Sequence, residues 1–295
     1  MVNLVAEIGI NYAYGEDKSA FLQNAIDLMT QAKLAGFNYV KLQKRTPSEC
    51  VPEKMKDKAR WTPWRKDLNA TYLQYKEDIE FTIKQWDVLF STSRDLGIQL
   101  FASVWDMNAL HFMEIMQKRH YKNYGMKTIV KIPSAKITDL ELCKAAREKF
   151  DVLMISTGMS TEEEIEKCVT ACDPDVIFHT HSEYPSELCD LNLNYIKHLQ
   201  KKYPLHDIGY SGHEYGLDTT IATVALGVKW IERHVTMSHD LWGTDQKSSI
   251  EPVGMFKLVK GVRELEAALG DPSIADKDYC RELSREERKK RETLQ

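Results

Sequence analysis

The chain has 295 residues, of which 43% are hydrophobic and 28% charged, a composition typical of a globular domain and not of a disordered chain. The formal net charge of -4 offers no basic surface, so nucleic acid is not an expected partner. No apolar stretch approaches the roughly 18 residues of a membrane span, and Met1–Leu4 lacks the charged and apolar regions of a signal peptide. We therefore expect a cytoplasmic protein without a membrane partner.

Short apolar or β-branched segments alternate with longer amphipathic segments along the whole chain. The first amphipathic segment, Lys18–Ala35, has apolar residues at helical spacing and ends at Gly36. Strand–helix repetition predicts a parallel sheet. Eight repeats, with no Gly-rich dinucleotide turn after the first strand, favour a (β/α)8 TIM barrel in the α/β class over an open sheet. The predicted strands are Leu4–Ile8, Tyr39–Leu42, Gln99–Ser103, Ile129–Ile132, Val152–Ser156, Val176–His179, Ile208–Ser211 and Trp230–His234.

Three details of local structure can be predicted beside the alternation. Two helix starts have the spacing of capping boxes, Thr138 with Glu141 and Ser160 with Glu163. Residues 44–78 form a long insertion after the second strand, which is either a lid or substrate loop or a cover for the barrel rim. We expect one barrel domain over residues 1–282, a charged tail over residues 283–295 that is a solvated helix or frayed end, and no second domain.

Nearly every predicted strand ends in polar residues. A single such residue is weak evidence, because satisfied buried polar groups are common in proteins. In a TIM barrel, however, the carboxyl ends of all strands converge on the catalytic mouth. Polar residues at the same end of the eight predicted strands therefore predict an active site at the mouth. Its candidate residues are Glu7, Lys41, Gln43, Ser103, Lys131, Ser134, Ser156, Ser182, Ser211, His213, Glu232 and His234.

Two histidines in this set are candidate metal ligands. His213 and His234 follow adjacent strands, so their side chains can approach within metal-ligand range. Neutral imidazole is a common ligand for divalent transition metals, and a ligating histidine usually needs a neighbouring group to orient it. Glu232, two residues before His234 on the same strand, is a candidate for that role or for direct ligation. Histidines of the core or rim without a metal are the competing interpretation.

Two lysines predict that the mouth binds an anion. Lys41 and Lys131 project from neighbouring parts of the barrel, and Ser134, Ser156 and Ser211 add hydroxyl donors. A lysine is a compact charge suited to phosphate or carboxylate. Either lysine alone could extend along the rim to solvent, but two lysines together favour an anion site.

Many short segments of the chain, in the same order, resemble the sialic acid synthase family. Together they span almost the whole sequence, which makes the resemblance more specific than any one motif. The segments are Ala6–Gly9, Val40–Gln43, Lys131–Ser134, Ser156–Met159, Tyr184–Pro185, Gly209–His213, Glu232–His234 and Gly243–Pro252.

The resemblance implies an N-acetylneuraminate synthase-like enzyme. Such enzymes condense phosphoenolpyruvate with an N-acylated hexosamine, typically N-acetylmannosamine, giving a nine-carbon 2-keto acid and phosphate. The resemblance also implies a homodimer and a divalent metal, Mn²⁺ or Mg²⁺, on His213 and His234. By the resemblance, Lys131, Ser134, Ser156 and Ser211 match positions that hold phosphoenolpyruvate, and Glu7, Gln43, Tyr184 and Asp245 match positions that hold the sugar. Taking the resemblance together with the strand ends, we predict as catalytic residues Glu7, Lys41, Lys131 and Glu232. The predicted substrate-binding residues are Gln43, Ser103, Ser134, Ser156, Ser182, Tyr184, Ser211, Asp245 and Lys247.

The sequence departs from the family pattern at several sites. Gly212 stands where aspartate is usual, Ser182 where asparagine is common, and Lys136 where a sugar-contacting glutamate is usual. Ser103–Asp106 replaces a Thr-Pro-Phe type of segment. The chain also stops before the antifreeze-like domain that usually lends an arginine to the partner's sugar site. The identity of the sugar is therefore less determined than the use of phosphoenolpyruvate.

Two other functions remain open at this point. One is a lyase or aldolase of 2-keto sugar acids that forms a Schiff base on Lys131, which suits the barrel but does not explain the paired histidines. The other is a barrel that binds a sugar without turnover, which the altered sugar positions suggest.

Overall fold

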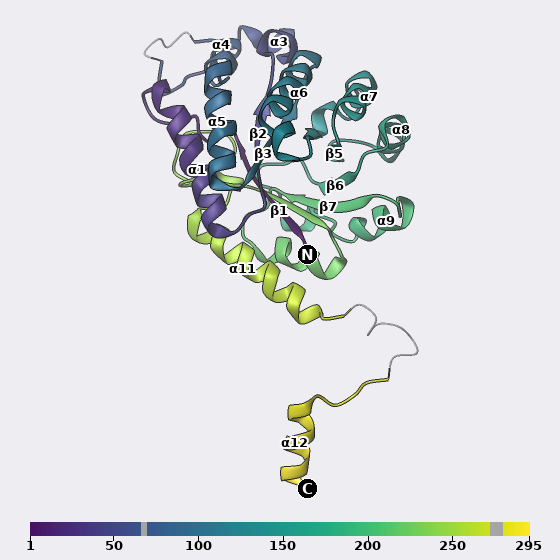
Figure 1. Cartoon of the computed structure of the whole chain (residues 1–295). Helices are drawn as coiled ribbons and strands as arrows, with labels where there is room; N and C mark the ends of the chain where they lie inside the picture. Colours follow the sequence, from purple (N-terminus) through teal and green to yellow (C-terminus); the bar gives the residue numbers. More distant parts are fainter. Residues whose placement is uncertain (66–69, 272–279) are drawn as a thin grey trace.

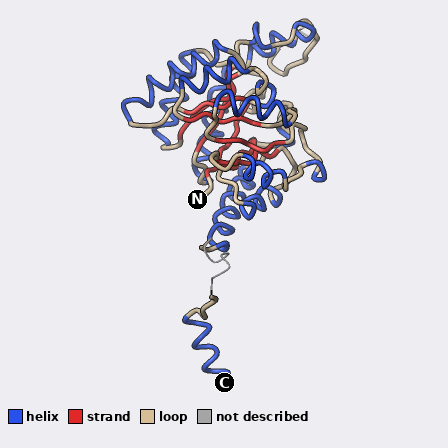
Figure 2. Tube along the Cα trace, turned by 90° about the vertical axis from the view of Figure 1, so that its right-hand side faces the viewer, coloured by secondary structure: helices blue, strands red, loops and turns tan. Residues whose placement is uncertain are grey.

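The computed structural model describes residues 1–65, 70–271 and 280–295. Eight parallel strands close into a barrel in the order β1 to β8, with each strand paired to its sequence neighbours and β8 paired to β1. Helices surround the strands, as Figures 1 and 2 show. The predicted TIM barrel is confirmed. The strands are β1 Asn3–Gly9, β2 Tyr39–Lys44, β3 Gln99–Val104, β4 Ile129–Ile132, β5 Val152–Ser156, β6 Val176–Thr180, β7 Asp207–Gly212 and β8 Trp230–His234.

The helices follow the predicted amphipathic segments. In α1, Phe21–Ala35, the predicted apolar face is buried, and Gly36 ends the helix with a φ of 97°. This left-handed conformation is one that glycine adopts without steric cost. The remaining α-helices are α2 Pro47–Cys50, α3 Glu53–Lys56, α4 Tyr72–Asp78, α5 Ile83–Leu96, α6 Met107–Tyr121, α7 Leu140–Lys149, α8 Glu162–Cys172, α9 Tyr195–Lys202, α10 Asp218–Ala222, α11 Pro252–Leu269 and α12 Arg285–Leu294.

Both predicted capping boxes are wrong by one residue. Helix α8 begins after Thr161, which forms the box with Glu164, and α7 begins after Asp139, whose carboxylate accepts from the Leu142 amide. In each case a neighbouring residue offers a cap one position later. The buried face of the helix determines the register, and the capping pattern alone does not reveal that face.

Apolar side chains fill the lower part of the barrel, and an upper layer of polar side chains lies at the mouth. The apolar cluster consists of Val5, Phe101, Ile129, Met154, Val176, Phe178 and Trp230. Successive inward positions along a strand are two residues apart. The next inward residues after Val5, Phe101 and Trp230 are Glu7, Ser103 and Glu232, all buried. An apolar strand therefore ends in a polar residue because its last inward side chain belongs to the upper layer, at the mouth.

A buried ion pair stabilises the loop after β7. The side chains of Arg233 and Glu214 are fully buried, with Arg233 Nη1 3.3 Å from Glu214 Oε1. Arg233 also donates to the Glu214 carbonyl at 2.7 Å, and Glu214 accepts from Tyr210 at 2.9 Å and from Thr220 at 2.6 Å. A Cβ at Gly212 would lie 2.4 Å from Glu214 Oε2, so glycine at this position leaves room for Glu214.

Replacing Glu214 with alanine should destabilise the protein by about 3–5 kcal/mol, because it leaves Arg233 charged and buried without its carboxylate. Urea denaturation followed by circular dichroism measures the loss. The control variant Glu163→Ala removes an exposed partner of Lys167 and should leave stability unchanged. A Glu214→Ala protein as stable as the control would show that the pair contributes little.

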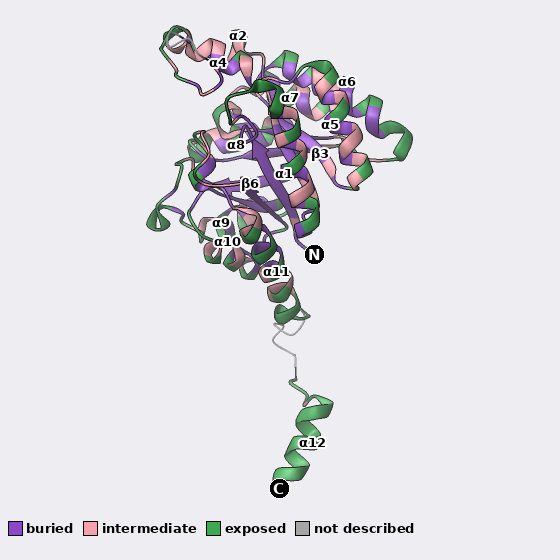
Figure 3. Ribbon diagram, turned by 90° about the vertical axis from the view of Figure 1, so that its left-hand side faces the viewer, coloured by how far each residue is buried: buried purple, intermediate pink, exposed green. Residues whose placement is uncertain are grey.

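The insertion over residues 44–78 contains α2, α3 and α4; α3 and α4 lie at the top of Figure 1, and α2 and α4 at the top of Figure 3. Trp64 and Tyr75 pack edge-on against Trp242 from the loop after β8, with ring centroids 4.9 and 5.6 Å apart. The insertion thus joins loops from two sides of the mouth, consistent with a cover.

At the other end of the chain, α12 has no buried residue and lies apart from the barrel (Figures 1 and 3). The division at residue 282 stays a prediction.

Within the described ranges, no helix combines the length and apolar character needed to cross a membrane.

Candidate active site

A cavity of about 200 Å³ opens at the carboxyl ends of the strands. All the predicted site residues except Asp245 and Lys247 line it: Glu7, Lys41, Gln43, Ser103, Lys131, Ser134, Ser156, Ser182, Tyr184, Ser211, His213, Glu232 and His234. The other lining residues, which were not predicted as site residues, are Trp105, Pro133, Ala135, Met159 and Thr180. None of the five carries a charge, so the search for charged and hydrogen-bonding groups at the strand ends passed over them, although Pro133 and Met159 lie in segments that resemble the family.

Two lysines and two glutamates form the charged floor of this cavity. Glu232 Oε1 lies 2.8 Å from Lys131 Nζ and 3.2 Å from Lys41 Nζ, and Lys41 Nζ lies 3.0 Å from Glu7 Oε2. Lys41 also donates to Ser103 Oγ at 2.7 Å. Each of the four charged side chains is at most 4% exposed, so their attractions are screened little by water.

Burial and the attraction between opposite charges shift the pKa values of these four groups in different directions. Burial raises the pKa of Glu7 to about 7, partly opposed by Lys41. Burial also acts on Glu232, but attraction to Lys131 and Lys41 outweighs it and lowers the pKa to about 2. Burial lowers the pKa of Lys131 to about 8, against the pull of Glu232. The floor therefore holds one firmly ionised carboxylate, Glu232, and one carboxyl group that can exchange a proton near neutral pH, Glu7.

The two predicted metal ligands face each other at the mouth. Their ring centroids are 5.3 Å apart, and the Tyr184 ring packs on His213 at 4.1 Å. His213 Nδ1 donates to the His181 carbonyl at 2.7 Å, which leaves Nε2 free to act as a ligand. His234 Nδ1 is buried without a hydrogen-bond partner among the described residues, 3.9 Å from Asp245 Oδ2. This donor set fits a divalent metal, because a neutral imidazole with an oriented ring is the form that ligates.

A second group of possible ligands lies outside the cavity floor. Ligand atoms of His181, Glu183 and Asp190 fall within 4.8 Å of one another. Glu183 and Asp190 are exposed, and exposed acidic groups commonly lie together without a metal. We assign no metal to this group.

Without metal, the two histidines should make stability depend on pH. Burial lowers the pKa of both His213 and His234 to about 3, from 6.5 in an unfolded chain. Both therefore favour folding above about pH 6.5, and this contribution is lost as the pH falls toward 3, by about 1.4 kcal/mol per pH unit for each. The raised pKa of Glu7 has the opposite effect: between about pH 4.5 and 7 it makes the protein more stable as the pH falls, which offsets the loss from one histidine.

Urea titrations in EDTA across this pH range test the effect. Stability should fall on acidification, and the fall should be shallower in His234→Asn. The control His111→Asn, on the exposed face of α6, should behave as the unmodified protein does. A His234→Asn protein with an unchanged pH slope would contradict the neutral, buried state of His234.

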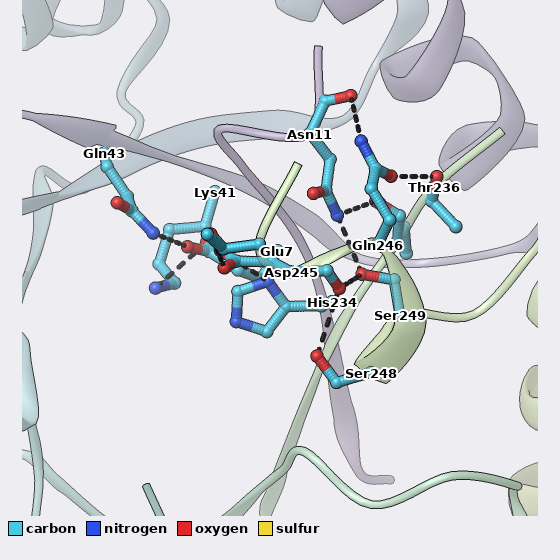
Figure 4. Close-up of polar contacts among 12 residues, drawn as sticks. Glu7, Asn11, Lys41, Gln43, His234, Thr236, Asp245, Gln246, Ser248 and Ser249 are labelled. Atoms are coloured by element: carbon cyan, nitrogen blue, oxygen red, sulfur yellow. Dashed lines mark hydrogen bonds and ion pairs between the residues drawn. The ribbon is translucent and has the colours of Figure 1, made fainter. Parts of the chain in front are cut away.

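Asp245 is fixed near His234 by a buried hydrogen-bond network (Figure 4). Ser249 Oγ donates to the Asp245 carbonyl at 2.6 Å, and Asn11 Nδ2 donates to Ser249 Oγ at 2.7 Å. Gln246 is buried and donates to the Asn11 carbonyl at 3.4 Å. Lys247, between the buried Gln246 and Ser248, is exposed, so the structure does not bring it into the cavity. The sequence segment Gly243–Pro252 did not show that Gln246 and Lys247, adjacent residues of a short 3-10 helix, face the interior and the solvent respectively.

Comparison with known proteins identifies the family of this chain. The model of the NeuB family matches residues 28–273. The chain belongs to the NeuB family. The predicted resemblance to sialic acid synthases is thereby confirmed, as is the prediction of an enzyme of the carbon–carbon bond-forming type.

Individual NeuB relatives match over most of the chain. The N-acetylneuraminate-9-phosphate synthase of Mus musculus is 32% identical, over 92% of this chain and 72% of its own length. The N,N'-diacetyllegionaminic acid synthase of Campylobacter jejuni is 28% identical, over 91% and 77%. A crystal structure of N-acetylneuraminic acid synthetase from Leptospira borgpetersenii, in complex with citrate, has a TM-score of 0.77 and 27% identity, covering 99% of this chain and 90% of that one.

Proposed function

We propose that this NeuB protein condenses phosphoenolpyruvate with the open-chain form of an N-acylated hexosamine, giving a nine-carbon 2-keto sugar acid and phosphate. Carbon three of the enol attacks the sugar aldehyde, water adds at carbon two, and the bond from carbon two to the phosphate oxygen breaks. The observation that carries the proposal is the placement of two buried lysines beside two neutral imidazoles in one cavity.

The lysines are suited to hold phosphoenolpyruvate. Lys131 contacts one acceptor among the described residues, Glu232 Oε1 at 2.8 Å, so its ammonium keeps donors for a substrate, and Lys41 adds a second positive charge 3.2 Å from the same oxygen. Hydroxyl groups of Ser134, Ser156 and Ser211 line the same cavity. Cations fixed in a site of low water content stabilise charge on the leaving phosphate without reorganising.

His213 and His234 would hold a divalent metal, Mn²⁺ or Mg²⁺. When bound, such a metal acts as a Lewis acid that polarises a carbonyl oxygen. The chain itself orients the ligands: the His181 carbonyl fixes the His213 ring and Tyr184 packs against it. Glu232 Oε2, buried and without a hydrogen-bond partner among the described residues, lies within the same cavity and is available to an incoming group.

Glu7 is placed to bind the sugar or to move a proton. Gln43 Nε2 donates to Glu7 Oε1 at 3.1 Å, and Lys41 contacts the other oxygen. A carboxyl group with a pKa of about 7 can give or take a proton efficiently near neutral pH. We assign it to a hydroxyl group of the sugar.

Phosphate release from phosphoenolpyruvate, measured with a panel of hexosamines with and without Mn²⁺, tests this function. Release should require both the hexosamine and the metal. No turnover with any sugar, despite metal bound to the protein, would contradict the proposal. The homodimer implied by the family resemblance and the cytoplasmic location expected from the sequence stay predictions, which light scattering and cell fractionation test.

A Schiff-base lyase is the second candidate, because burial lowers the pKa of Lys131 to about 8 and makes an amine nucleophile more accessible. The ion pair with Glu232 at 2.8 Å favours the protonated form and argues against it. Borohydride trapping of a pyruvate or sugar adduct on Lys131, unaffected by EDTA, would favour the lyase. The condensation predicts no trapped adduct.

A further inference from the structure

Arg45 directly follows β2 and lies on the same face of the strand end as Gln43. Side chains two residues apart share one face of a strand, so Arg45 comes one step nearer the rim than Gln43 does. The register pairs Gln43 with Ser103 of β3. Two residues further along both chains, the guanidinium of Arg45 stacks on Trp105, 4.3 Å from the ring centroid. Arg45 is only 7% exposed, so the fold holds a buried guanidinium beside the active site.

The Arg45 side chain has one hydrogen-bond partner among the described residues, the amide of Gln43. Arg45 Nη2 donates to Gln43 Oε1. Gln43 Nε2 donates to Glu7 Oε1 at 3.1 Å, a bond that Figure 4 marks with a dashed line. Gln43 lines the active-site cavity, whereas Arg45 lines a neighbouring cavity of about 440 Å³ and does not line the active-site cavity. Arg45 is therefore placed to act on the active site through Gln43.

This contact determines the orientation of the Gln43 amide. A glutamine amide keeps nearly the same shape when it is turned by half a revolution, so its neighbours decide where its oxygen and its amino group point. A carboxyl group such as Glu7 accepts from the amino group when ionised and donates to the oxygen when protonated, so Glu7 alone does not fix the amide. A guanidinium has donors only. The oxygen of Gln43 must therefore face Arg45, and its amino group must face Glu7.

Stability of the fold does not account for this arginine. In the part of the chain that the structure describes, its guanidinium makes no ion pair, and its Nη1 has no hydrogen-bond partner. Glu80 attracts it from a distance but pairs with Lys44 at 2.6 Å. Burial, and then repulsion by Arg45, lower the pKa of Lys76 to about 7. A buried charge without a counter-ion costs free energy, so an apolar side chain stacked on Trp105 would serve the fold at least as well.

An arginine that packs on an aromatic ring at the rim only for its apolar surface is the competing interpretation. It accounts for the contact with Trp105. It does not account for the bond to Gln43, because an arginine that serves only as packing directs its charged end to water.

We propose that Arg45 is a positioning residue for the acceptor sugar, which fixes the Gln43 amide with its amino group toward Glu7. This inference rests on the proposed function, in which Glu7 is assigned to a hydroxyl group of the open-chain sugar. An amide that is already fixed loses no further freedom when the sugar binds beside it. Loss of Arg45 should therefore weaken acceptor binding rather than slow the chemical steps.

Steady-state kinetics of Arg45→Met with N-acetylmannosamine, at saturating phosphoenolpyruvate and Mn²⁺, test the inference. The KM for the sugar should rise about tenfold, the size expected for one charge-assisted hydrogen bond, with kcat and the KM for phosphoenolpyruvate little changed. Arg45→Lys should recover part of the loss, because an ammonium still donates to the Gln43 oxygen. The matched control Arg119→Met, on the exposed side of α6, should leave all three constants unchanged.

A double-mutant cycle shows whether Arg45 acts through Gln43. Gln43→Ala should raise the KM for the sugar at least as much as Arg45→Met does. Adding Arg45→Met to Gln43→Ala should raise it no further, because two residues that act through one contact are not additive. Additive effects would show that Arg45 contacts the sugar itself and would overturn the positioning role.

Urea denaturation separates positioning from a structural role. Arg45→Met should be at least as stable as Arg119→Met, because methionine still packs on Trp105 and a buried charge without a counter-ion is removed. A less stable Arg45→Met protein in which kcat falls and the KM for both substrates rises would mark Arg45 as a structural residue and overturn the inference.

Failure of the inference differs from failure of the proposed function. An unchanged KM for the sugar in an Arg45→Met enzyme that still turns over would overturn the positioning role and leave the condensation intact. No phosphoenolpyruvate-dependent turnover of the unmodified protein with any hexosamine of the panel would overturn the condensation, and the positioning role with it.

Discussion

Replacing Lys131 with methionine should lower kcat/KM for phosphoenolpyruvate by about a thousandfold, the size expected when one fixed charge is removed from a buried site. Lys131 is 2% exposed and lies 2.8 Å from Glu232. Methionine retains most of the length of the side chain but supplies no charge for the substrate. Glu232 keeps Lys41 as a partner at 3.2 Å, so the variant should fold. Steady-state phosphate release measures the effect.

Lys144→Met is the matched control, because Lys144 lies on the exposed face of α7 and outside the cavity. It should retain full activity. A folded Lys131→Met enzyme within tenfold of the unmodified protein would remove Lys131 from the machinery that binds phosphoenolpyruvate.

Replacing His234 with alanine should abolish the metal-dependent activity and weaken Mn²⁺ binding by at least about 100-fold, because half of the imidazole pair is lost. His234 is almost fully buried and contacts Asp245 only at 3.9 Å, so its hydrogen bonds contribute little to folding. Calorimetric titration with Mn²⁺ measures binding, and phosphate release measures activity.

The control for this variant is His111→Ala, whose side chain is exposed on α6. It should bind Mn²⁺ as the unmodified protein does. An active His234→Ala enzyme with unchanged metal dependence would exclude His234 as a ligand. Weakened Mn²⁺ binding with full activity would separate the metal from the reaction.

Much of the fold and site could be predicted because strand periodicity and polar strand ends are local properties of the sequence. The inward position after Val5 is Glu7 and the one after Trp230 is Glu232, so the two-residue period alone assigns these carboxylates to the mouth. The register then sets Glu7 opposite both Lys41 and His234. Closure of the barrel was expected from the number of repeats.

The contacts across the barrel could not be predicted in the same way. The pair of Lys131 and Glu232 joins β4 to β8, and its distance depends on the curvature and packing of the whole sheet. His213 is oriented by a backbone carbonyl, which no side-chain pattern records. The place of the insertion could not be predicted because residues 44–78 have no regular period, and packing of Trp64 on Trp242 helps to set their position over the mouth.

In the proposed condensation, phosphoenolpyruvate loses phosphate by cleavage of its carbon–oxygen bond. Mass spectrometry of the products formed from phosphoenolpyruvate labelled with ¹⁸O at the bridging oxygen tests this step most directly, with Mn²⁺ and an N-acylated hexosamine present. One nine-carbon 2-keto acid should form for each phosphate released, with the label in the phosphate. Label retained in pyruvate, or phosphate released without any nine-carbon acid, would contradict it.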